Sequence, residues 1–290
     1  MEQEVEFAGS GGVVLRGEAR ADPGDPSVVL LHGGGQRRFA WSNTGEVLAR
    51  NGWYAVALDL RGHGDSYWAP NGDYGHEAFA SDTAAVALSF DRPVLVGASL
   101  GGLSSLLALG KHGEKIASAL VLVDIATRME RQGAERIVGF MSQKPDGFET
   151  LEEAADAIST YNPHRPKSKD LSGLKKNLRL GDDGRWRWHW DPAFFAAFPK
   201  FRSETQEPEI DRHLLDNAAR ELTLPTLLVR GRMSDLLSEE GAREFLKQVP
   251  HAEFADISGA GHMVAGDRND AFCGAVSDFL RDHVGHIVAA

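Results

Sequence analysis

The chain has 290 residues, of which 42% are hydrophobic and 25% charged, as expected for a soluble globular protein with one large domain or one domain carrying an insertion. Its net charge of −11 argues against a nucleic-acid-binding surface, which would need a basic patch. The lone Cys273 excludes an intrachain disulfide, residues 1–10 lack the pattern of a signal peptide, and no apolar run approaches the roughly 18 residues of a membrane span, so we expect a cytoplasmic protein.

Short apolar runs recur along the chain, and helical patterns separate them. The runs cover residues 13–19, 27–35, 54–64, 93–99, 118–126, 226–235 and 252–262. The helical patterns cover residues 41–52, 74–90, 100–113, 238–249 and 267–284. Near-continuous Val and Leu are typical of parallel strands buried on both faces. The alternation predicts an α/β fold with right-handed crossovers and a mostly parallel, doubly wound sheet.

This alternation stops between residues 127 and 222. No comparable strand-like run occurs there, and Thr150 to Glu153 form a capping box that begins a short helix. The stretch RWRWHWDPAFFAAFPKF, residues 185–201, holds three of the six tryptophans. Asp191 and Pro192 are expected at the start of another helix. We therefore expect a core of residues 1–126 and 223–290, interrupted by a mostly helical insertion of residues 127–222.

One serine lies where an apolar run meets a helical pattern. The sequence Gly97-Ala98-Ser99-Leu100-Gly101 matches G-x-S-x-G, a weak signal by itself but a stronger one at a strand-to-helix joint. A tight turn alone would explain the glycines, which allow close approach to neighbouring backbone. A strained turn that exposes the serine hydroxyl is the functional interpretation.

A serine is a poor nucleophile unless a base removes its proton and an acid orients that base. Asp235 follows the strand-like run that begins at residue 226, and His262 follows the run that begins at residue 252. Both are expected at the same edge of the sheet as Ser99. Upstream, His32-Gly33-Gly34-Gly35 ends an earlier run and matches an HGGG-type oxyanion loop.

The segments LHGGGQ, DLRGHGDS, VGASLGG, GRMSD and GAGH together make the chain resemble an α/β-hydrolase. It is similar to serine-nucleophile members with a helical lid, and its core resembles the epoxide-hydrolase-like and esterase branch. The resemblance implies an eight-stranded sheet and a lid at residues 127–222. It also implies roles for site residues: Ser99 as nucleophile, His262 as general base and then acid, Asp235 as orienting carboxylate, and the N–H groups of Leu100 and Gly34 as the oxyanion hole, with Gly33 or Gly35 as alternatives to Gly34.

A second aspartate competes with Asp235 for the role of the acid. Asp124 ends the run LVLVDIA, and some α/β-hydrolases carry the acid after this earlier strand. Chain order and the loop after the penultimate strand favour Asp235. In that case we expect Asp124 to hold the entry to the insertion through hydrogen bonds to nearby backbone amides.

Further residues are candidates for substrate contact or for structure. His32, Trp188 and Trp190 are candidate substrate-binding residues, although tryptophans in the insertion are most simply its core. His63, His112 and His251 are expected to be structural or exposed, whereas His189 fits either role. No metal-binding motif occurs and the glycines at 97, 101 and 102 miss the dinucleotide-binding pattern, so we expect neither a metal nor a cofactor.

A serine triad with an oxyanion hole suits acyl transfer to water. We expect hydrolysis of a carboxylic ester or lactone with a small to medium apolar acyl group. Hydrolysis of a C–C bond, cofactor-free perhydrolysis and ligand binding by a receptor are the alternatives. Epoxide hydrolysis is disfavoured because that chemistry uses an aspartate in place of Ser99 and two tyrosines in the lid, where this insertion has only Tyr161. The sequence fixes neither the substrate nor the oligomeric state.

Overall fold

The computed structural model describes residues 2–161, 170–196 and 212–284. Its centre is an eight-stranded sheet with the strand order β1-β2-β4-β3-β5-β6-β9-β10. The strands β3, β4, β5, β6, β9 and β10 are parallel, whereas β1 and β2 run antiparallel to their neighbours. The strands are β1 (Glu2–Ala8), β2 (Val14–Arg20), β3 (Ser27–Leu31), β4 (Tyr54–Leu58), β5 (Val94–Ala98), β6 (Ala119–Val123), β9 (Thr226–Gly231) and β10 (Glu253–Ile257). The predicted mostly parallel, eight-stranded α/β fold is confirmed.

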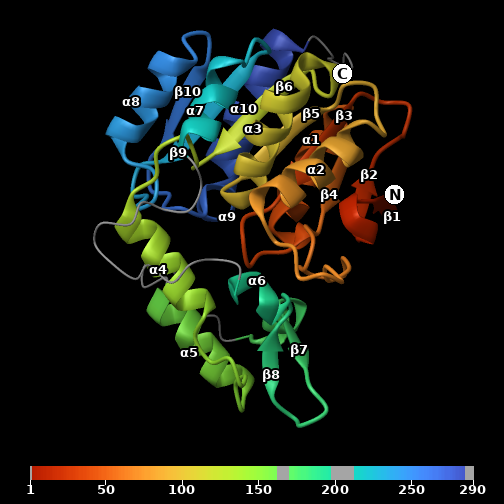
Figure 1. Ribbon diagram of the computed structural model, residues 1–290, viewed down its shortest axis with the longest axis vertical. Coiled ribbons are helices and arrows are strands. Elements are labelled where there is room, and N and C mark those ends of the chain that lie inside the picture. The colour runs from red at the N-terminus through yellow and green to blue at the C-terminus, as the bar shows by residue number, and fades with distance from the viewer. Residues whose placement is uncertain (1, 162–169, 197–211, 285–290) are drawn as a thin grey trace.

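Helices cover both faces of the sheet (Figure 1). One face is packed by α1 (Ser42–Arg50) and α10 (Asn269–His283), with the short α9 (Val264–Asp267) beside them. The other face is packed by α2 (His76–Ala87), α3 (Leu100–His112), α7 (Arg212–Arg220) and α8 (Glu239–Gln248). Successive residues of a strand point to opposite faces, so Val28 and Leu30 join the first layer while Val29 and Leu31 join the second. This two-sided burial explains the continuous apolar runs.

The inserted segment projects away from the sheet (Figure 1). It contains α4 (Arg131–Met141), α5 (Leu151–Tyr161), a hairpin of β7 (Leu178–Leu180) and β8 (Trp186–Trp188), and α6 (Pro192–Ala196). The insertion was expected to be mostly helical without a strand-like run comparable to those of the core, and the hairpin adds two short strands to that expectation. In β8 two tryptophans alternate with an arginine, which is a strand pattern too short to stand out in sequence.

The final helix of the stretch, α7, belongs to the sheet layers and does not extend with the rest of the insertion. It packs against α3 so closely that a Cβ built on Gly110 would lie 2.5 Å from the Cβ of Ala218. Among the described residues, those that depart from the core therefore end with α6. The stretch 127–222 is thus one connection between β6 and β9, but it divides into a projecting part and a helix that covers the sheet.

One edge of the sheet is formed by β1, which is not among the strands expected from the sequence. Glu2, Glu4 and Glu6 occupy alternate positions and are all exposed. Glu2 pairs with Arg20, and Glu6 pairs with Arg16, on the neighbouring β2. Because β1 is solvated, its residues do not form the apolar run by which the central strands are recognised.

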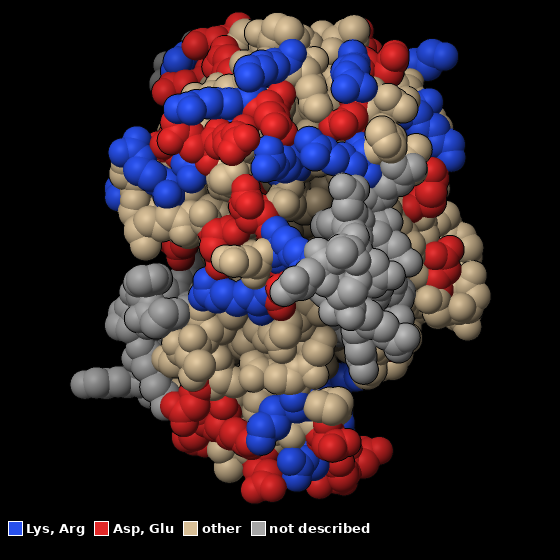
Figure 2. All heavy atoms as spheres, turned by 60° about the vertical axis from the view of Figure 1, so that its left-hand side comes forward, with Lys and Arg blue, Asp and Glu red and all other residues tan. Residues whose placement is uncertain are grey.

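Charged residues of both signs are interspersed on the face of the molecule shown in Figure 2. Outside the grey atoms, this face has no area occupied by basic residues alone, as expected from the acidic composition. Within the described residues, none of the helices has the length and apolar character required to cross a bilayer.

Candidate active site

Ser99 lies at the turn between β5 and α3, as the motif predicts. Its backbone has φ 47° and ψ −114°, a conformation that a non-glycine residue rarely adopts and that indicates local strain. Ser99 N–H donates to Val123 O of the neighbouring strand (3.2 Å), and Ser99 O accepts from Leu103 N–H (2.9 Å). The surrounding sheet and helix therefore hold the turn in its strained form.

The glycines beside Ser99 allow the backbone to approach closely. A Cβ on Gly97 would lie 2.4 Å from Gly101 O, and a Cβ on Gly101 would lie 2.3 Å from Leu31 O. Both neighbours are backbone atoms, which cannot easily move away. The glycines of the motif are thus needed for the packing of β5, α3 and β3 at this point.

His262 follows β10 and contacts a buried carboxylate. Its Nδ1 lies 2.8 Å from Oδ2 of Asp124, which is the residue directly after β6. The Asp124 side chain is 0% exposed, and that of His262 is 16% exposed. Asp124 also accepts hydrogen bonds from Gly231 N–H (2.9 Å) at Oδ1 and from the Ser234 hydroxyl at Oδ2. Its two oxygens thus accept three hydrogen bonds, which fix the orientation of the carboxylate.

Asp235 does not occupy this position, which corrects the preference drawn from chain order. Its side chain is 40% exposed and pairs with Arg136 of α4. Gly133 of the same helix packs on the Asp235 backbone, where an added Cβ would lie 2.2 Å from Asp235 O. The turn after β9 carries Asp235 towards the insertion, whereas Asp124 remains at the carboxyl end of β6.

Gly231 explains how His262 reaches Asp124 across the intervening strand. The sheet order places β9 between β6 and β10, so the loop after β10 must cross the end of β9. A Cβ on Gly231 would lie 2.1 Å from Gly261 O and 2.8 Å from Ala260 O. Only glycine leaves room for this crossing, and the glycine that ends the run TLLVRG was a signal that sequence analysis overlooked.

The loop after β3 lies against the Ser99 turn. A Cβ on Gly33 would lie 3.3 Å from Ser99 Cβ, and Gly101 N–H donates to His32 O (3.2 Å). Gly33 N–H donates to Gln36 Oε1 (3.0 Å), and Gly35 N–H donates to His63 Nε2 (3.0 Å). These two N–H groups are therefore occupied by the protein itself.

Gly34 N–H and Leu100 N–H form no hydrogen bond with any of the described residues. Leu100 is the first residue of α3, where N–H groups have no partner within the helix. Of the three glycines that the HGGG motif offers as oxyanion donors, Gly34 is the one whose N–H group has no hydrogen-bond partner among the described residues.

His32 is wrongly assigned to substrate contact. It is fully buried, its Nδ1–H donates to Gly33 O (2.7 Å), and its Nε2 accepts from Leu60 N–H (3.0 Å). Burial lowers the pKa of His32 to about 4, so its imidazole is neutral near pH 7. With both ring nitrogens bonded to backbone, His32 shapes the loop and does not face a ligand.

Apolar side chains of the insertion cover the loop at Gly34 and Gly35. Atoms of Met141 and Trp190 lie 2.3 and 3.2 Å from a Cβ built on Gly35, and Phe194 lies 3.6 Å from one built on Gly34. Trp188 is one layer further from the loop, stacked on Trp190 with ring centroids 5.0 Å apart. Phe194 belongs to the aromatic stretch 185–201 that the sequence singles out, whereas nothing in the local pattern around Met141 indicates its proximity to the loop.

No cluster of His, Cys, Asp and Glu suited to a metal ion occurs within residues 2–161, 170–196 and 212–284. At the carboxyl ends of the strands the structure instead places Ser99 on the turn after β5 and the His262–Asp124 contact beside the neighbouring strand β6. Gly34 and Leu100 lie at the Ser99 turn, with N–H groups that bond to none of the described residues. This set of groups can transfer protons and stabilise a developing oxyanion.

The whole chain is similar to known hydrolases. The model of the alpha/beta hydrolase family matches residues 28–275. The chain is 29% identical to the esterase Rv0045c of Mycobacterium tuberculosis over 265 residues, which cover 88% of this chain and 83% of that protein. It is 27% identical to the esterase YbfF of Escherichia coli over 262 residues, 88% and 93% of the two chains.

Among solved structures, an alpha/beta hydrolase from Novosphingobium aromaticivorans superposes with a TM-score of 0.77 at 26% identity. That alignment covers 97% of this chain and 98% of the other. The family match spans most of the sequence, and the strand order agrees with the fold that the motifs imply. The protein is thus a hydrolase of the α/β fold, and it belongs to the alpha/beta hydrolase family.

Proposed function

We propose that this protein is a serine hydrolase that cleaves a carboxylic ester or lactone through an acyl-enzyme. In this proposal Ser99 is the nucleophile, His262 the general base and Asp124 the orienting acid. The contact between His262 Nδ1 and Asp124 Oδ2 is the observation that carries this proposal. It joins residues 138 positions apart at the carboxyl ends of the strands, where the backbone of Ser99 is strained. The esterases among the relatives support the choice of ester chemistry.

The buried carboxylate determines which nitrogen of His262 acts as the base. Asp124 accepts the Nδ1–H of His262, so Nε2 carries the lone pair that removes the Ser99 proton. The imidazolium that forms is stabilised by the same carboxylate. Ser99 Oγ then forms a bond to the carbonyl carbon, and the alcohol leaves with the proton from His262. A water molecule, deprotonated by His262, releases the acid and restores Ser99.

The negative charge on the carbonyl oxygen would be stabilised by Gly34 N–H and Leu100 N–H. Both groups are fixed by the backbone before substrate arrives, so little reorganisation accompanies the reaction. Leu100 lies at the N-terminus of α3, where the helix dipole further favours a negative charge.

The substrate's acyl group is proposed to be apolar and small to medium in size. Met141, Trp190 and Phe194 lie over Gly34 and Gly35 and offer no ionised group to a substrate there. They come from the insertion, so we assign the projecting part of residues 127–222 the role of a lid that selects the acyl group.

A fluorophosphonate probe followed by a panel of activated esters of increasing acyl length tests this function. The adduct is expected on Ser99, and Ser99→Ala is expected to abolish labelling and turnover. Ser104→Ala is the matched control, because Ser104 is a buried serine on the next turn of α3 whose hydroxyl donates to Leu100 O (2.6 Å). A labelled Ser99→Ala variant, or ester turnover that survives it, would exclude the mechanism.

A further inference from the structure

Three buried imidazole rings lie in a row behind the oxyanion loop. The ring centroids of His32 and His63 are 5.2 Å apart, and those of His63 and His189 are 6.0 Å apart. They come from the loop after β3, the turn after β4 and the insertion after β8, respectively. The row therefore joins the insertion to the loop that carries Gly34, and the proposed mechanism makes no use of it.

Two of these rings accept hydrogen bonds from backbone N–H groups, one in the loop after β3 and one in the turn after β4. His63 Nε2 accepts from Gly35 N–H (3.0 Å), and His189 Nδ1 accepts from Gly64 N–H (2.8 Å). The Nδ1–H of His63 donates to Arg61 O (2.8 Å). Burial lowers the pKa of His63 to about 3 and that of His189 well below its usual value. Both rings are thus neutral near pH 7 and keep the lone pairs that accept these hydrogen bonds.

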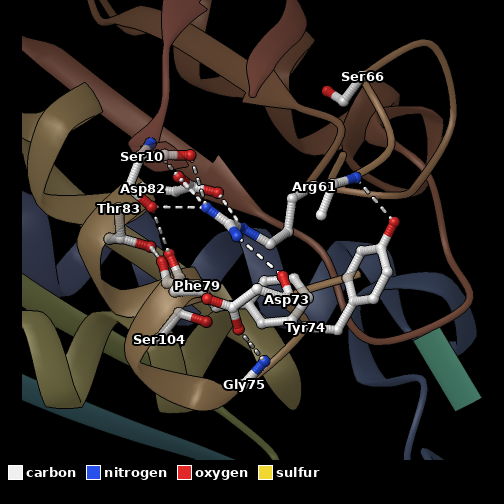
Figure 3. Close-up of polar contacts among 12 residues, drawn as sticks. Ser10, Arg61, Ser66, Asp73, Tyr74, Gly75, Phe79, Asp82, Thr83 and Ser104 are labelled. Atoms are coloured by element: carbon white, nitrogen blue, oxygen red, sulfur yellow. Dashed lines mark hydrogen bonds and ion pairs between the residues drawn. The ribbon is translucent and has the colours of Figure 1, made fainter. Parts of the chain in front are cut away.

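The turn between the two histidines is anchored firmly on its other side. Figure 3 shows the buried Arg61 guanidinium between Ser10, Asp73 and Asp82. Its Nε and Nη2 donate to both carboxylate oxygens of Asp82 (2.6 and 2.7 Å), and its Nη1 donates to Asp73 O (2.9 Å). A buried bidentate pair of this kind allows little local motion, so His63 extends from a fixed base.

The insertion contacts this turn at two backbone groups. Besides the hydrogen bond from Gly64 N–H to His189, Asp191 N–H donates to Gly62 O (2.8 Å). The Asp191 carboxylate accepts from the hydroxyl of Tyr74, whose ring appears beside Arg61 in Figure 3. The position of the insertion and the position of the turn are therefore linked by hydrogen bonds.

We propose that His189 and His63 are positioning residues that couple the insertion to the oxyanion loop. His189 fixes the turn at Gly64, and His63 on that turn holds Gly35 N–H, which leaves the neighbouring Gly34 N–H directed at the substrate oxygen. This inference rests on the proposed function for its kinetic consequence, but its structural consequence does not. Removal of either link should loosen residues 33–36 and weaken binding of the transition state more than binding of the substrate.

Asn and Gln substitutions separate the hydrogen bond from the bulk of the ring. The amide of Asn places an acceptor near the position of Nδ1, and that of Gln places one near Nε2. For His189, which accepts at Nδ1, Asn is the rescuing variant and Gln the disrupting one. For His63, which accepts at Nε2, the two are reversed. His251→Gln is the control, because His251 contacts Leu224 O (3.0 Å) away from this row.

Two measurements on the full chain test the coupling. In hydrogen–deuterium exchange, the peptide that contains residues 33–36 should exchange faster in His189→Gln and His63→Asn than in His189→Asn, His63→Gln and His251→Gln. With an activated ester, His189→Gln and His63→Asn should lower kcat about tenfold with KM changed less than threefold, because a small displacement of an oxyanion donor is costly. Melting temperatures show whether each variant folds.

The possible outcomes distinguish this inference from the proposed function. Faster exchange of residues 33–36 in both disrupting variants, together with the drop in kcat, supports the coupling. Unchanged exchange in folded His189→Gln overturns it whether or not the protein hydrolyses esters. Equal loss of kcat in His189→Asn and His189→Gln also overturns it, because the acceptor would then be irrelevant. Absence of ester turnover in the wild type counts against the proposed function, and the exchange data alone then decide the coupling.

Discussion

The ends of β6 and β9 each carry an aspartate, yet the two sites differ in almost every physical respect. Asp124 follows β6 directly, has a positive φ of 52°, is 0% exposed and accepts three hydrogen bonds. Asp235 lies four residues beyond β9, is 40% exposed and has one arginine partner. A buried carboxylate is stable only when donors surround it, and one of the Asp124 donors is His262. The surroundings of a carboxylate therefore indicate its role better than its order in the chain.

The largest expected effect on kcat comes from replacing the carboxylate of Asp124 with an amide, and the same change at Asp235 provides the comparison. Asp124→Asn should lower kcat by about 10⁴, since an amide cannot maintain the tautomer of His262 or stabilise its imidazolium. Asp235→Asn should leave kcat within about threefold of the wild type, because an exposed ion pair contributes little. Steady-state kinetics on one activated ester, with melting temperatures for both variants, make the measurement. A deep loss in Asp235→Asn with normal activity in Asp124→Asn would reverse the assignment.

A smaller decrease in kcat is expected from a substitution at Gly231, where the end of β9 meets the loop that carries His262. Gly231→Ala introduces a Cβ into space occupied by Gly261 O and Ala260 O, so the loop must shift and His262 moves with it. A displacement of about 1 Å should lower kcat by about 10².

Gly274→Ala in α10 is the matched control for Gly231→Ala, because a Cβ at Gly274 meets no heavy atom within 4 Å. It should stabilise the helix by about 0.5–1 kcal/mol and leave kcat unchanged. If both glycine variants keep wild-type kinetics, the loop tolerates displacement and the crossing at Gly231 has no catalytic importance.

Burial of ionisable groups also affects stability in acid, and the buried histidines provide the test. His32 and His63 have pKa values of about 4 and 3, lowered by burial, while unfolded histidine titrates near 6.5. Between these values the unfolded chain binds more protons, so the free energy of unfolding falls as pH falls below about 6.5. Each histidine contributes a slope of up to about 1.4 kcal/mol per pH unit.

Denaturant unfolding at several pH values between 4 and 7 measures this slope. His63→Gln, which cannot be protonated in this range, should reduce it by up to about 1.4 kcal/mol per pH unit relative to the wild type. An unchanged slope would mean that His63 titrates alike in the folded and unfolded chain.

The smallest expected effect concerns the aromatic side chains of the insertion that pack on the loop at Gly34 and Gly35. Trp190→Phe creates space beside Gly35 and should raise the ratio of kcat/KM for long over short acyl esters about fivefold, within the range of methylene-sized changes in a pocket. Trp186→Phe is the control on the hairpin strand β8. A uniform loss for all esters together with a lower melting temperature would show that Trp190 is only a core residue.

The sequence predicts those parts of the site that local pattern determines. Ser99 follows the buried strand β5, His262 follows the edge strand β10, and the glycines around Ser99 mark a close approach of backbone. The choice between Asp124 and Asp235 depends on how the loop after β10 crosses β9, which is a tertiary property that appears in sequence only as Gly231. Burial of His32 could not be inferred either, because the HGGG motif does not show which way its side chain points. The hairpin of the insertion was missed because three-residue strands leave almost no periodicity.

The acidic edge strand β1 has a consequence for self-association. An unpaired edge exposes backbone N–H and C=O groups to which a strand of another molecule can add, and charged side chains along the edge oppose such pairing. Glu2, Glu4 and Glu6 place charged side chains at alternate positions along this edge, and two of them pair with arginines of β2. Replacing Glu2, Glu4 and Glu6 together with the neutral Gln should therefore promote edge-to-edge aggregation that starts from β1 even while the rest of the fold persists.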